Sequence, residues 1–284
     1  MSLLSRDEIR IFIGPQQVHL VRLGGRIRQH VADVRAVCVT APAPEHSPWQ
    51  SALAALETLL EEFRTCKANV VVVLSNHFVR YALVRHSAET NGADEQQALI
   101  HHYFTTIYGS AADHWEYRLS ETGNDEYQVA VAISPALPQS LDALFTQTNL
   151  VLHSIQPHLM AAFNLLRNEV GDNAWFALIE PGLLCLARLD HSQWRFLRTV
   201  NHHDNWIDEL AANLLRAKIM TAAAASDLAG EVPVYVFAPG HCEAEWTRLE
   251  NRAEDLFGAS PLRLLRPPQL FDDDLPVFAT ALSG

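Results

Sequence analysis

The chain has 284 residues, enough for two compact units of ordinary domain size, and 49% of them are hydrophobic while 19% are charged. That composition excludes an intrinsically disordered chain, and the formal net charge of -12 repels the phosphates of nucleic acids and anionic lipids. We find no signal peptide, no apolar run long enough to span a membrane, and no Cys-x-x-Cys pair among Cys38, Cys66, Cys185 and Cys242. We therefore expect a cytoplasmic protein with buried, reduced thiols, no nucleic-acid partner and no membrane insertion.

The opening segment predicts a β-hairpin followed by a third strand. Isoleucine recurs at every second position over residues 9–13, residues 14–17 (Gly-Pro-Gln-Gln) supply a turn, and residues 18–23 are extended again. A further strand is expected over residues 35–40, before a proline-rich loop. The first three strands are thus predicted to be consecutive in the chain.

The next elements indicate an α/β unit. Ser47, Pro48 and Gln50 stand where a capping box requires an N-cap serine, a proline at the first helical position and a glutamine at the third. Residues 70–74 are a continuous apolar run, typical of a strand buried on both faces. Hairpin, helix and buried strand in this order are typical of α/β folds.

A smaller pattern interrupts the first half between about residues 76 and 134. A helix around 95–108 and strands near 115–119 and 127–133 predict a small inserted α+β subdomain. With this insertion, the first half is expected to cover residues 1–170.

The second half, residues 171–284, repeats the opening theme in shortened form. Residues 175–179 and 183–189 flank the turn Glu180-Pro181-Gly182, a third strand is expected over 194–200, and a buried strand over 232–237 ends near Gly240. The amphipathic helix between them carries one apolar stripe, which we expect to pack on the sheet: Ile207, Leu210, Ala211, Leu214 and Leu215. The order of elements predicts a duplicated topology.

Three segments, in this order along the chain, resemble a known family: residues 72–84 (VVLSNHFVRYALV), 150–163 (LVLHSIQPHLMAAF) and 276–282 (PVFATAL). Together with the two hairpins they resemble the actin-like cytoplasmic platform proteins of type IV pilus and type II secretion assembly, of the PilM and GspL kind. The resemblance implies an actin-like ATPase (ribonuclease H-like) fold with two related subdomains.

The same resemblance implies a role at the inner face of the bacterial inner membrane. Members of this kind act as scaffolds that bind the cytoplasmic tail of a single-span inner-membrane protein of the PilN kind. The resemblance places the partner groove in the first half, where we name Asn76, Phe78 and Arg80 as candidate contacts. Formation of a homodimer is left open.

The resemblance also identifies a nucleotide cleft, which the residues here weaken. Nucleotide-binding members offer Gly, Ser or Thr in the first turn and an Asp-x-Gly in the second. This chain has Pro15, which lacks an N–H, and Glu180 in place of the aspartate. The candidate cleft residues are Gly14, Gln16, Gln17, Glu180, Gly182 and Gly240.

We therefore expect a degenerate ATPase fold that is not an enzyme and holds no cofactor, no metal and no catalytic residue. The alternative is an ATP-binding protein, with Mg²⁺, whose nucleotide state gates partner binding. A third hypothesis, an unrelated enzyme, lacks a converging acid and base.

Other polar residues are interpreted as structural. His101 and His102, like the cluster of His202, His203 and Asp204, lack matched ligands elsewhere and are expected at the surface or at helix ends. Ser75 lacks the Gly-x-Ser-x-Gly context of a nucleophile and is expected to shape a strand end. Trp206 fits either a partner-binding stripe or a helix packed on its own sheet, and we favour the second.

Overall fold

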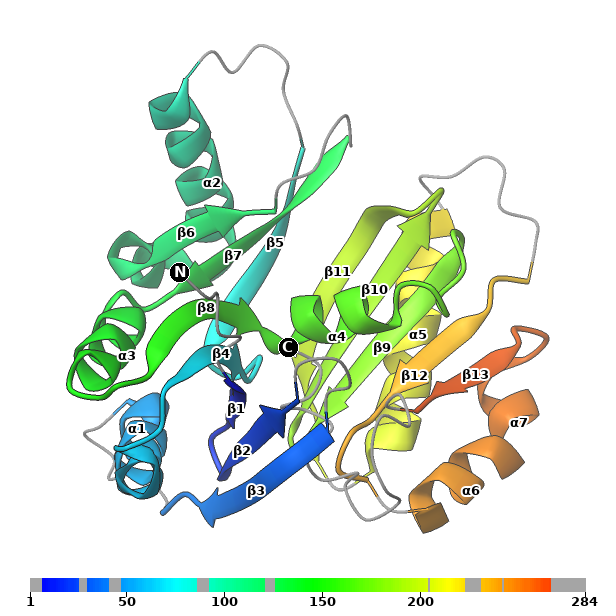
Figure 1. The fold of residues 1–284 in the computed structure, drawn as a ribbon. Coiled ribbons are helices and arrows are strands. Elements are labelled where there is room, and N and C mark those ends of the chain that lie inside the picture. The colour runs from blue at the N-terminus through cyan, green and yellow to red at the C-terminus, as the bar shows by residue number, and fades with distance from the viewer. Residues whose placement is uncertain are drawn as a thin grey trace. The chain divides into compact units, whose positions relative to one another are not determined.

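The computed structural model describes residues 7–25, 30–40, 47–85, 92–120, 126–203, 205–222, 231–241 and 243–266. Within them the strands form two five-stranded sheets and one three-stranded sheet (Figure 1). The family-like segment 276–282, Asp204 of the histidine cluster and Cys242 lie outside the described residues.

The first sheet opens with three antiparallel strands and continues with two parallel ones, in the order β3-β2-β1-β4-β8. Its strands are β1 (Asp7–Ile13), β2 (Gln17–Gly24), β3 (His30–Cys38), β4 (Ala68–Leu74) and β8 (Val151–Pro157). Strand β4, which lies between β1 and β8, is buried at six of seven positions, as expected for a strand covered on both faces.

The second sheet repeats this plan in the order β11-β10-β9-β12-β13. Its strands are β9 (Ala174–Glu180), β10 (Leu183–Asp190), β11 (Gln193–Asn201), β12 (Val234–Phe237) and β13 (Leu262–Leu265). The first three are antiparallel, and β12 and β13 follow in parallel, so the predicted duplication of topology is confirmed.

A third sheet, in the order β5-β7-β6, forms the small subdomain that the sequence predicts between the first-sheet strands β4 and β8. Its elements are β5 (Val79–Arg85), α2 (Ala93–Tyr108), the 3-10 helix η2 (Gly109–His114), β6 (Glu116–Leu119) and β7 (Tyr127–Ile133). Phe104 is fully buried at its centre and contacts the rings of Tyr108, Trp115 and Tyr117.

The remaining described helices accompany the two large sheets. They are α1 (Pro48–Leu60), η1 (Glu61–Phe63), α3 (Ala136–Thr146), α4 (His158–Leu166), α5 (Trp206–Ala222), α6 (Glu243–Asn251) and α7 (Ala253–Phe257). The predicted capping box is present at α1, where the backbone N–H of Ser47 donates to Oε1 of Gln50 at 2.9 Å. No membrane-spanning helix is found among the helices that the structure describes.

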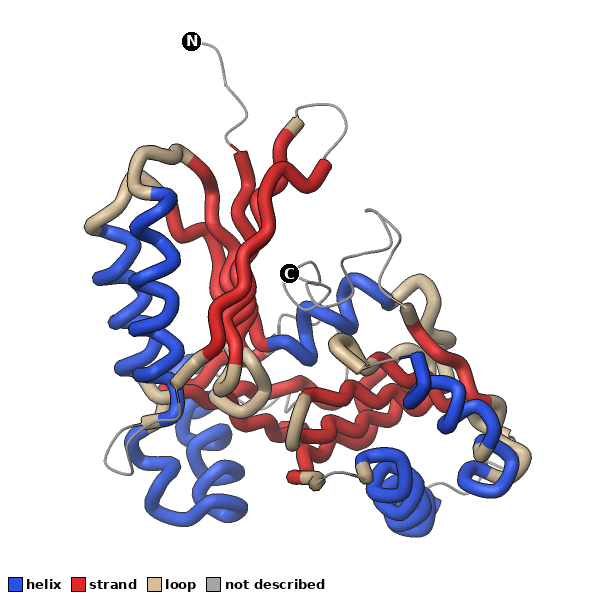
Figure 2. Tube along the Cα trace, turned by 90° about the horizontal axis from the view of Figure 1, so that it is seen from below, coloured by secondary structure: helices blue, strands red, loops and turns tan. Residues whose placement is uncertain are grey.

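Helix α5 lies against one face of the second sheet (Figure 1, Figure 2). Trp206 is 3% exposed and belongs to that core together with Ile207, Leu210 and Leu214, which confirms the packing interpretation of the stripe. Leu215 was assigned to the same stripe, and that assignment is wrong because its side chain is 61% exposed. Successive helical residues differ by about 100°, so Leu214 and Leu215 cannot both face the sheet squarely.

Contacts group the chain into two compact units, one comprising Met1–Val79, Ser134–Leu165 and Pro267–Gly284, and the other Arg80–Ile133 and Leu166–Arg266. The three-stranded sheet therefore groups with the second sheet, although its residues interrupt the first half of the chain. The expected division at residue 170 stays a prediction.

The cysteines depart in part from expectation. Cys185 is buried and Cys66 is half-buried, but Cys38 is exposed at the end of the edge strand β3. All three are free thiols, and the expectation of burial is wrong for Cys38.

Candidate functional site

The first hairpin turn, between β1 and β2, uses its own hydrogen-bonding groups to close. The N–H of Gly14 donates to the carbonyl oxygen of Gln17 at 2.9 Å, and Pro15 has no N–H to offer. The carbonyl of Gln16 accepts from the N–H of Val39 at 2.7 Å. Two of the four backbone donors that a phosphate-binding turn would present are therefore engaged or missing.

Packing also requires glycine at position 14. A Cβ there would lie 2.8 Å from Cε1 of Phe12 and 3.2 Å from the carbonyl oxygen of Gln17, which is closer than side chains normally approach. The ring of Phe12 in turn lies against the rings of His19 and His158, with centroids 5.8 and 5.2 Å apart. Aromatic packing thus occupies the space beside the turn.

The side chain of Gln17, the first residue of β2, contacts another side chain of the same strand. Nε2 of His19 lies 2.7 Å from Oε1 of Gln17, and His19 is only 5% exposed. Gln17 therefore supports β2, and no hydroxyl group stands in the turn to replace the missing N–H of Pro15.

The residues after β4 form a hydrogen-bonded turn. The N–H of Ser75 donates to the carbonyl of Ile13 at 2.9 Å, and the hydroxyl and carbonyl oxygens of Ser75 accept from His77 and Phe78. The predicted strand-end role of Ser75 is confirmed.

Two of the three candidate partner contacts are buried in this turn. Asn76 is 1% exposed, and its Oδ1 accepts a hydrogen bond of 3.1 Å from the N–H of Leu159 in the first turn of α4, where helix N–H groups lack internal partners. Phe78 is 9% exposed, while Arg80 is half-buried near Tyr108. Burial raises the pKa of Tyr108, and the charge of Arg80 opposes that rise. Binding of a partner by these residues stays a prediction, and Arg80 is the one most open to it.

The second hairpin turn, between β9 and β10, is closed by a histidine that the sequence interpretation placed at the surface. Gly182 adopts a left-handed φ of 81°, and its carbonyl accepts from the N–H of His202 at 3.0 Å. The His202 ring is buried, with Nε2 at 2.8 Å from the carbonyl oxygen of Glu180 and Nδ1 at 2.7 Å from that of His203. The expectation of a surface or helix-end role is therefore wrong for His202, because its ring is buried against Glu180, which lies 22 residues earlier in the sequence.

The carboxylate at this turn is buried as well, since Glu180 is 3% exposed. Burial, reinforced by the charge of Glu180, raises the pKa of the Cys185 thiol well above its usual value. Cys185 is thus held as a neutral thiol, which excludes it as a thiolate nucleophile.

The loop after β12 contains Gly240, with a left-handed φ of 86°, and then His241, whose ring packs against Trp206 at 5.1 Å between centroids. Trp206 donates from Nε1 to Oε1 of Glu245 at 3.0 Å. Burial lowers the pKa of His241, the charge of Glu245 opposes this, and the nearby His202 adds to it. A Cβ at Gly240 would meet no atom within 4 Å, so the backbone of this loop remains approachable.

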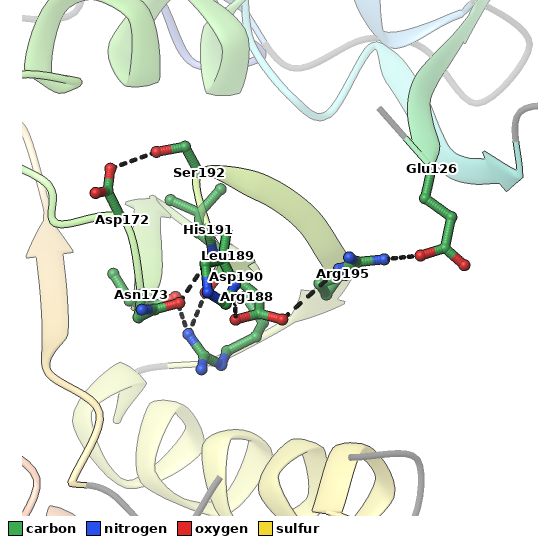
Figure 3. A network of polar contacts seen from close by, with 10 residues as sticks. Glu126, Asp172, Asn173, Arg188, Leu189, Asp190, His191, Ser192 and Arg195 are labelled. Carbon is green, nitrogen blue, oxygen red and sulfur yellow. Dashed lines mark hydrogen bonds and ion pairs between the residues drawn. The ribbon is translucent and has the colours of Figure 1, made fainter. Parts of the chain in front are cut away.

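Within the second unit, a polar network joins the β10–β11 turn to the small subdomain (Figure 3). Arg195 pairs with Glu126, which precedes β7, and its Nε lies 3.8 Å from Oδ2 of Asp190. Its guanidinium also lies 5.7 Å from the centre of the Tyr127 ring. Arg195 was not singled out from the sequence, and its charge serves to attach the three-stranded sheet.

The β10–β11 turn is also hydrogen-bonded to the loop before β9. His191 and Ser192 have left-handed φ values of 50° and 62°, as in a type I′ hairpin turn, and the N–H of Ser192 donates to the carbonyl of Asp172 at 2.8 Å. Arg188 is 3% exposed, donates to the carbonyl of Ala174 at 3.2 Å, and has its pKa lowered by burial. These charged groups support the sheet, and no three His, Cys, Asp or Glu side chains of the described ranges converge as a metal site would require.

Comparison with known proteins supports the assignment of the fold. No protein-family model matches the sequence, and no curated protein does either. Among solved structures, the chain is similar to one in a PilM-PilN type IV pilus biogenesis complex, with a TM-score of 0.65 and 15% identity over 97% of this chain and 96% of that one.

Two further structures extend this likeness. One is a protein of Bacteroides thetaiotaomicron with an actin-like ATPase fold and unknown function, with a TM-score of 0.62 and 8% identity over 98% of this chain and 96% of that one. The other is the cytoplasmic domain of EpsL, an inner-membrane component of the type II secretion system of Vibrio cholerae, with a TM-score of 0.54 and 11% identity over 97% and 93%. The chain has the actin-like ATPase fold, and the predicted fold is confirmed.

Proposed function

We propose that this protein is a non-catalytic scaffold of a type IV pilus or type II secretion-like assembly platform. It lies at the inner face of the bacterial inner membrane and binds the cytoplasmic tail of a single-span membrane protein of the PilN kind. The observation that carries the proposal is the likeness, over 97% of this chain, to a structure of a PilM-PilN complex.

The two hairpin turns support the absence of nucleotide chemistry. The first turn has Pro15 and an internally bonded Gly14, and the second is closed by the ring of His202. The first turn thus offers fewer free backbone N–H groups to phosphate oxygens than a nucleotide-binding turn would. A protein of this fold that binds no nucleotide still offers a rigid surface to a partner.

Titration calorimetry with a synthetic peptide tests the proposal directly. The peptide is the cytoplasmic tail of the PilN-like protein of the same organism, and we expect saturable binding of one peptide per chain. Arg80→Glu should weaken binding several-fold, because Arg80 is the partly exposed member of the predicted contact set. Arg118→Glu is the matched control, since Arg118 lies in the same subdomain and its side chain is 76% exposed. Absence of binding by the unaltered protein would refute the scaffold role with this partner.

The alternative, an ATP-gated protein, is favoured by one observation. Gly182 and Gly240 both keep left-handed conformations, and the Gly240 loop is open to close approach. A nucleotide that binds only the folded state raises Tm by mass action. At a concentration of one hundred times Kd, it adds about 2.7 kcal/mol to the free energy of unfolding. The scaffold role predicts an unchanged Tm with Mg-ATP at millimolar concentration. An upward shift that Gly240→Val removes would establish the alternative.

A further inference from the structure

The small subdomain is connected through the chain to one compact unit and groups by its contacts with the other. Its two covalent connections lead to the first unit and lie at residues 79–80 and 133–134, where the division between the units falls. The core of the subdomain, around Phe104, and the core around Trp175 of the second sheet are separate clusters. The attachment of the subdomain to the second sheet therefore includes contacts outside these two cores.

Strands β7 and β11 are in contact, and charged side chains link the subdomain to β11 (Figure 3). Glu126, which precedes β7, pairs with Arg195 of β11 and also with Arg85 of β5, the latter at 3.4 Å. Nε of Arg195 lies 3.8 Å from Oδ2 of Asp190, whose Oδ1 lies 3.0 Å from Nδ1 of His191. The network thus extends from β5 in the subdomain to the turn between β10 and β11.

A β-bulge presents Arg195 to the subdomain. In the pairing of β10 with β11, Arg188 lies opposite Phe196 and Leu189 lies opposite Trp194. Arg195 is therefore the extra residue of β11, without a partner in the ladder, and a bulge bends its strand and re-aims the extra side chain. The neighbouring side chain of Phe196 packs on the core of the second sheet, while Arg195 pairs with the residue before β7.

Arg195 is the cation that two carboxylates share. Its side chain is 30% exposed, and those of Glu126 and Asp190 are 41% and 25% exposed, so all three are partly removed from water. The planar guanidinium also lies 5.7 Å from the centre of the Tyr127 ring. Isolated ion pairs at a surface contribute little, but a network around one ordered arginine contributes more. Loss of Arg195 therefore removes several contacts between the subdomain and the second sheet at once.

We propose that this network is a latch, which makes the small subdomain move with the second sheet rather than with the half of the chain into which it is inserted. With the latch closed, the subdomain and the second sheet behave as one body. Once the latch is broken, the connections at residues 79–80 and 133–134 govern the subdomain, and it moves independently of the second sheet. The proposal does not rest on the proposed scaffold function, because it involves neither the candidate tail-binding residues nor the candidate nucleotide cleft.

Ionic strength controls such a latch. The Debye length is about 10 Å at 0.1 M salt and about 3 Å at 1 M, so partly exposed charges attract one another much less at the higher concentration. Low salt therefore keeps the latch closed, and salt near 1 M releases it.

Distance measurements by pulsed electron paramagnetic resonance test the proposal. Spin labels are attached to the full chain through a non-natural amino acid at Ile107 on α2 and Leu215 on α5, whose side chains are 58% and 61% exposed. At low salt we expect one narrow distribution of distances between the labels. Arg195→Gln should widen this distribution at least twofold. Arg118→Gln is the matched control and should leave the width unchanged, because Arg118 pairs with Glu116 inside β6.

Two further comparisons distinguish the latch from a general loss of stability. Glu126→Gln should also widen the distribution, and adding Arg195→Gln should widen it no further, because both residues belong to one network. Salt at 1 M should widen the distribution of the protein that carries only the labels, and should leave that of Arg195→Gln unchanged. A distribution that stays narrow in Arg195→Gln overturns the proposal, and so does one that is already broad at low salt without that substitution.

Discussion

The two five-stranded sheets share one strand order, yet their first hairpins are closed in different ways. In the first sheet, the turn bonds to itself through Gly14 and Gln17 and packs its glycine against Phe12. In the second, the turn has Gly182 in a left-handed conformation and takes its hydrogen bonds from His202 beyond β11. The two halves therefore share a topology but differ in the interactions that close their first hairpin turns.

The two turns are stabilised by different interactions. The first turn depends on sterics, because the space around Gly14 excludes even a methyl group. The second depends on hydrogen bonds, because the His202 ring faces two carbonyl oxygens that can only accept. Glu180 also supplies a buried carboxylate at the same turn.

Removal of the His202 ring should give the largest effect. His202→Phe leaves the carbonyl groups of Glu180 and His203 without their donors, and each unsatisfied buried group costs about 1 to 3 kcal/mol. We expect the free energy of unfolding to fall by roughly 2 to 4 kcal/mol. Urea denaturation followed by tryptophan fluorescence measures this change.

Two further variants sharpen that test. His203→Phe replaces the exposed neighbour and should change stability by less than about 0.5 kcal/mol. His202→Gln keeps one donor and should recover part of the loss. If His202→Phe proves as stable as the unaltered protein, the second turn does not depend on these hydrogen bonds.

The first hairpin turn should be destabilised by the addition of a single methyl group. Gly14→Ala places a methyl group 2.8 Å from the ring of Phe12, and the resulting displacement should cost about 1 to 3 kcal/mol. Gly171→Ala is the control, because its Cβ would approach the Tyr235 hydroxyl only to an ordinary 3.5 Å. Equal stability of the two variants in urea would show that the first turn relaxes without cost.

Local patterns in the sequence were sufficient to predict most of the fold. The alternation at residues 9–13, the capping residues Ser47 and Gln50, and the buried run of β4 each reflect interactions within one element and the burial it requires. The repeated hairpin, helix and strand order then predicted two equivalent sheets. Helices α6 and α7 were missed because α6 buries only Leu249 and α7 only Phe257, which leaves too weak an apolar period.

Candidate site residues were harder to predict because their roles depend on distant partners. The role of His202 depends on its contact with the carbonyl of Glu180. The role of Asn76 depends on its hydrogen bond with the N–H of Leu159, 83 residues away. Leu215 differs from Leu214 only in which side of α5 the sheet covers. No local pattern distinguishes these cases, since burial is decided by elements that pack from elsewhere in the chain.

The smallest expected effect concerns His241, beside the second turn. Burial lowers the pKa of its ring below the ordinary 6.5, with Glu245 opposing and His202 reinforcing the shift. In the unfolded chain the ring binds a proton at a higher pH than in the fold, so the unfolded state holds more protons through this window. The corresponding stability is therefore present above pH 6.5 and is lost as the pH falls through the lowered value.

Urea denaturation at pH 7.5 and at pH 5.5 measures this contribution. His241→Asn removes the titrating ring, so its loss of stability between the two pH values should be smaller than that of the unaltered protein. Asp208, whose pKa is also lowered, titrates below its ordinary 3.8 and stays ionised at both pH values. His102→Asn, at an exposed position on α2, is the control and should leave the pH dependence unchanged. An equal loss in His241→Asn and the unaltered protein would mean that burial beside Trp206 does not oppose protonation of His241.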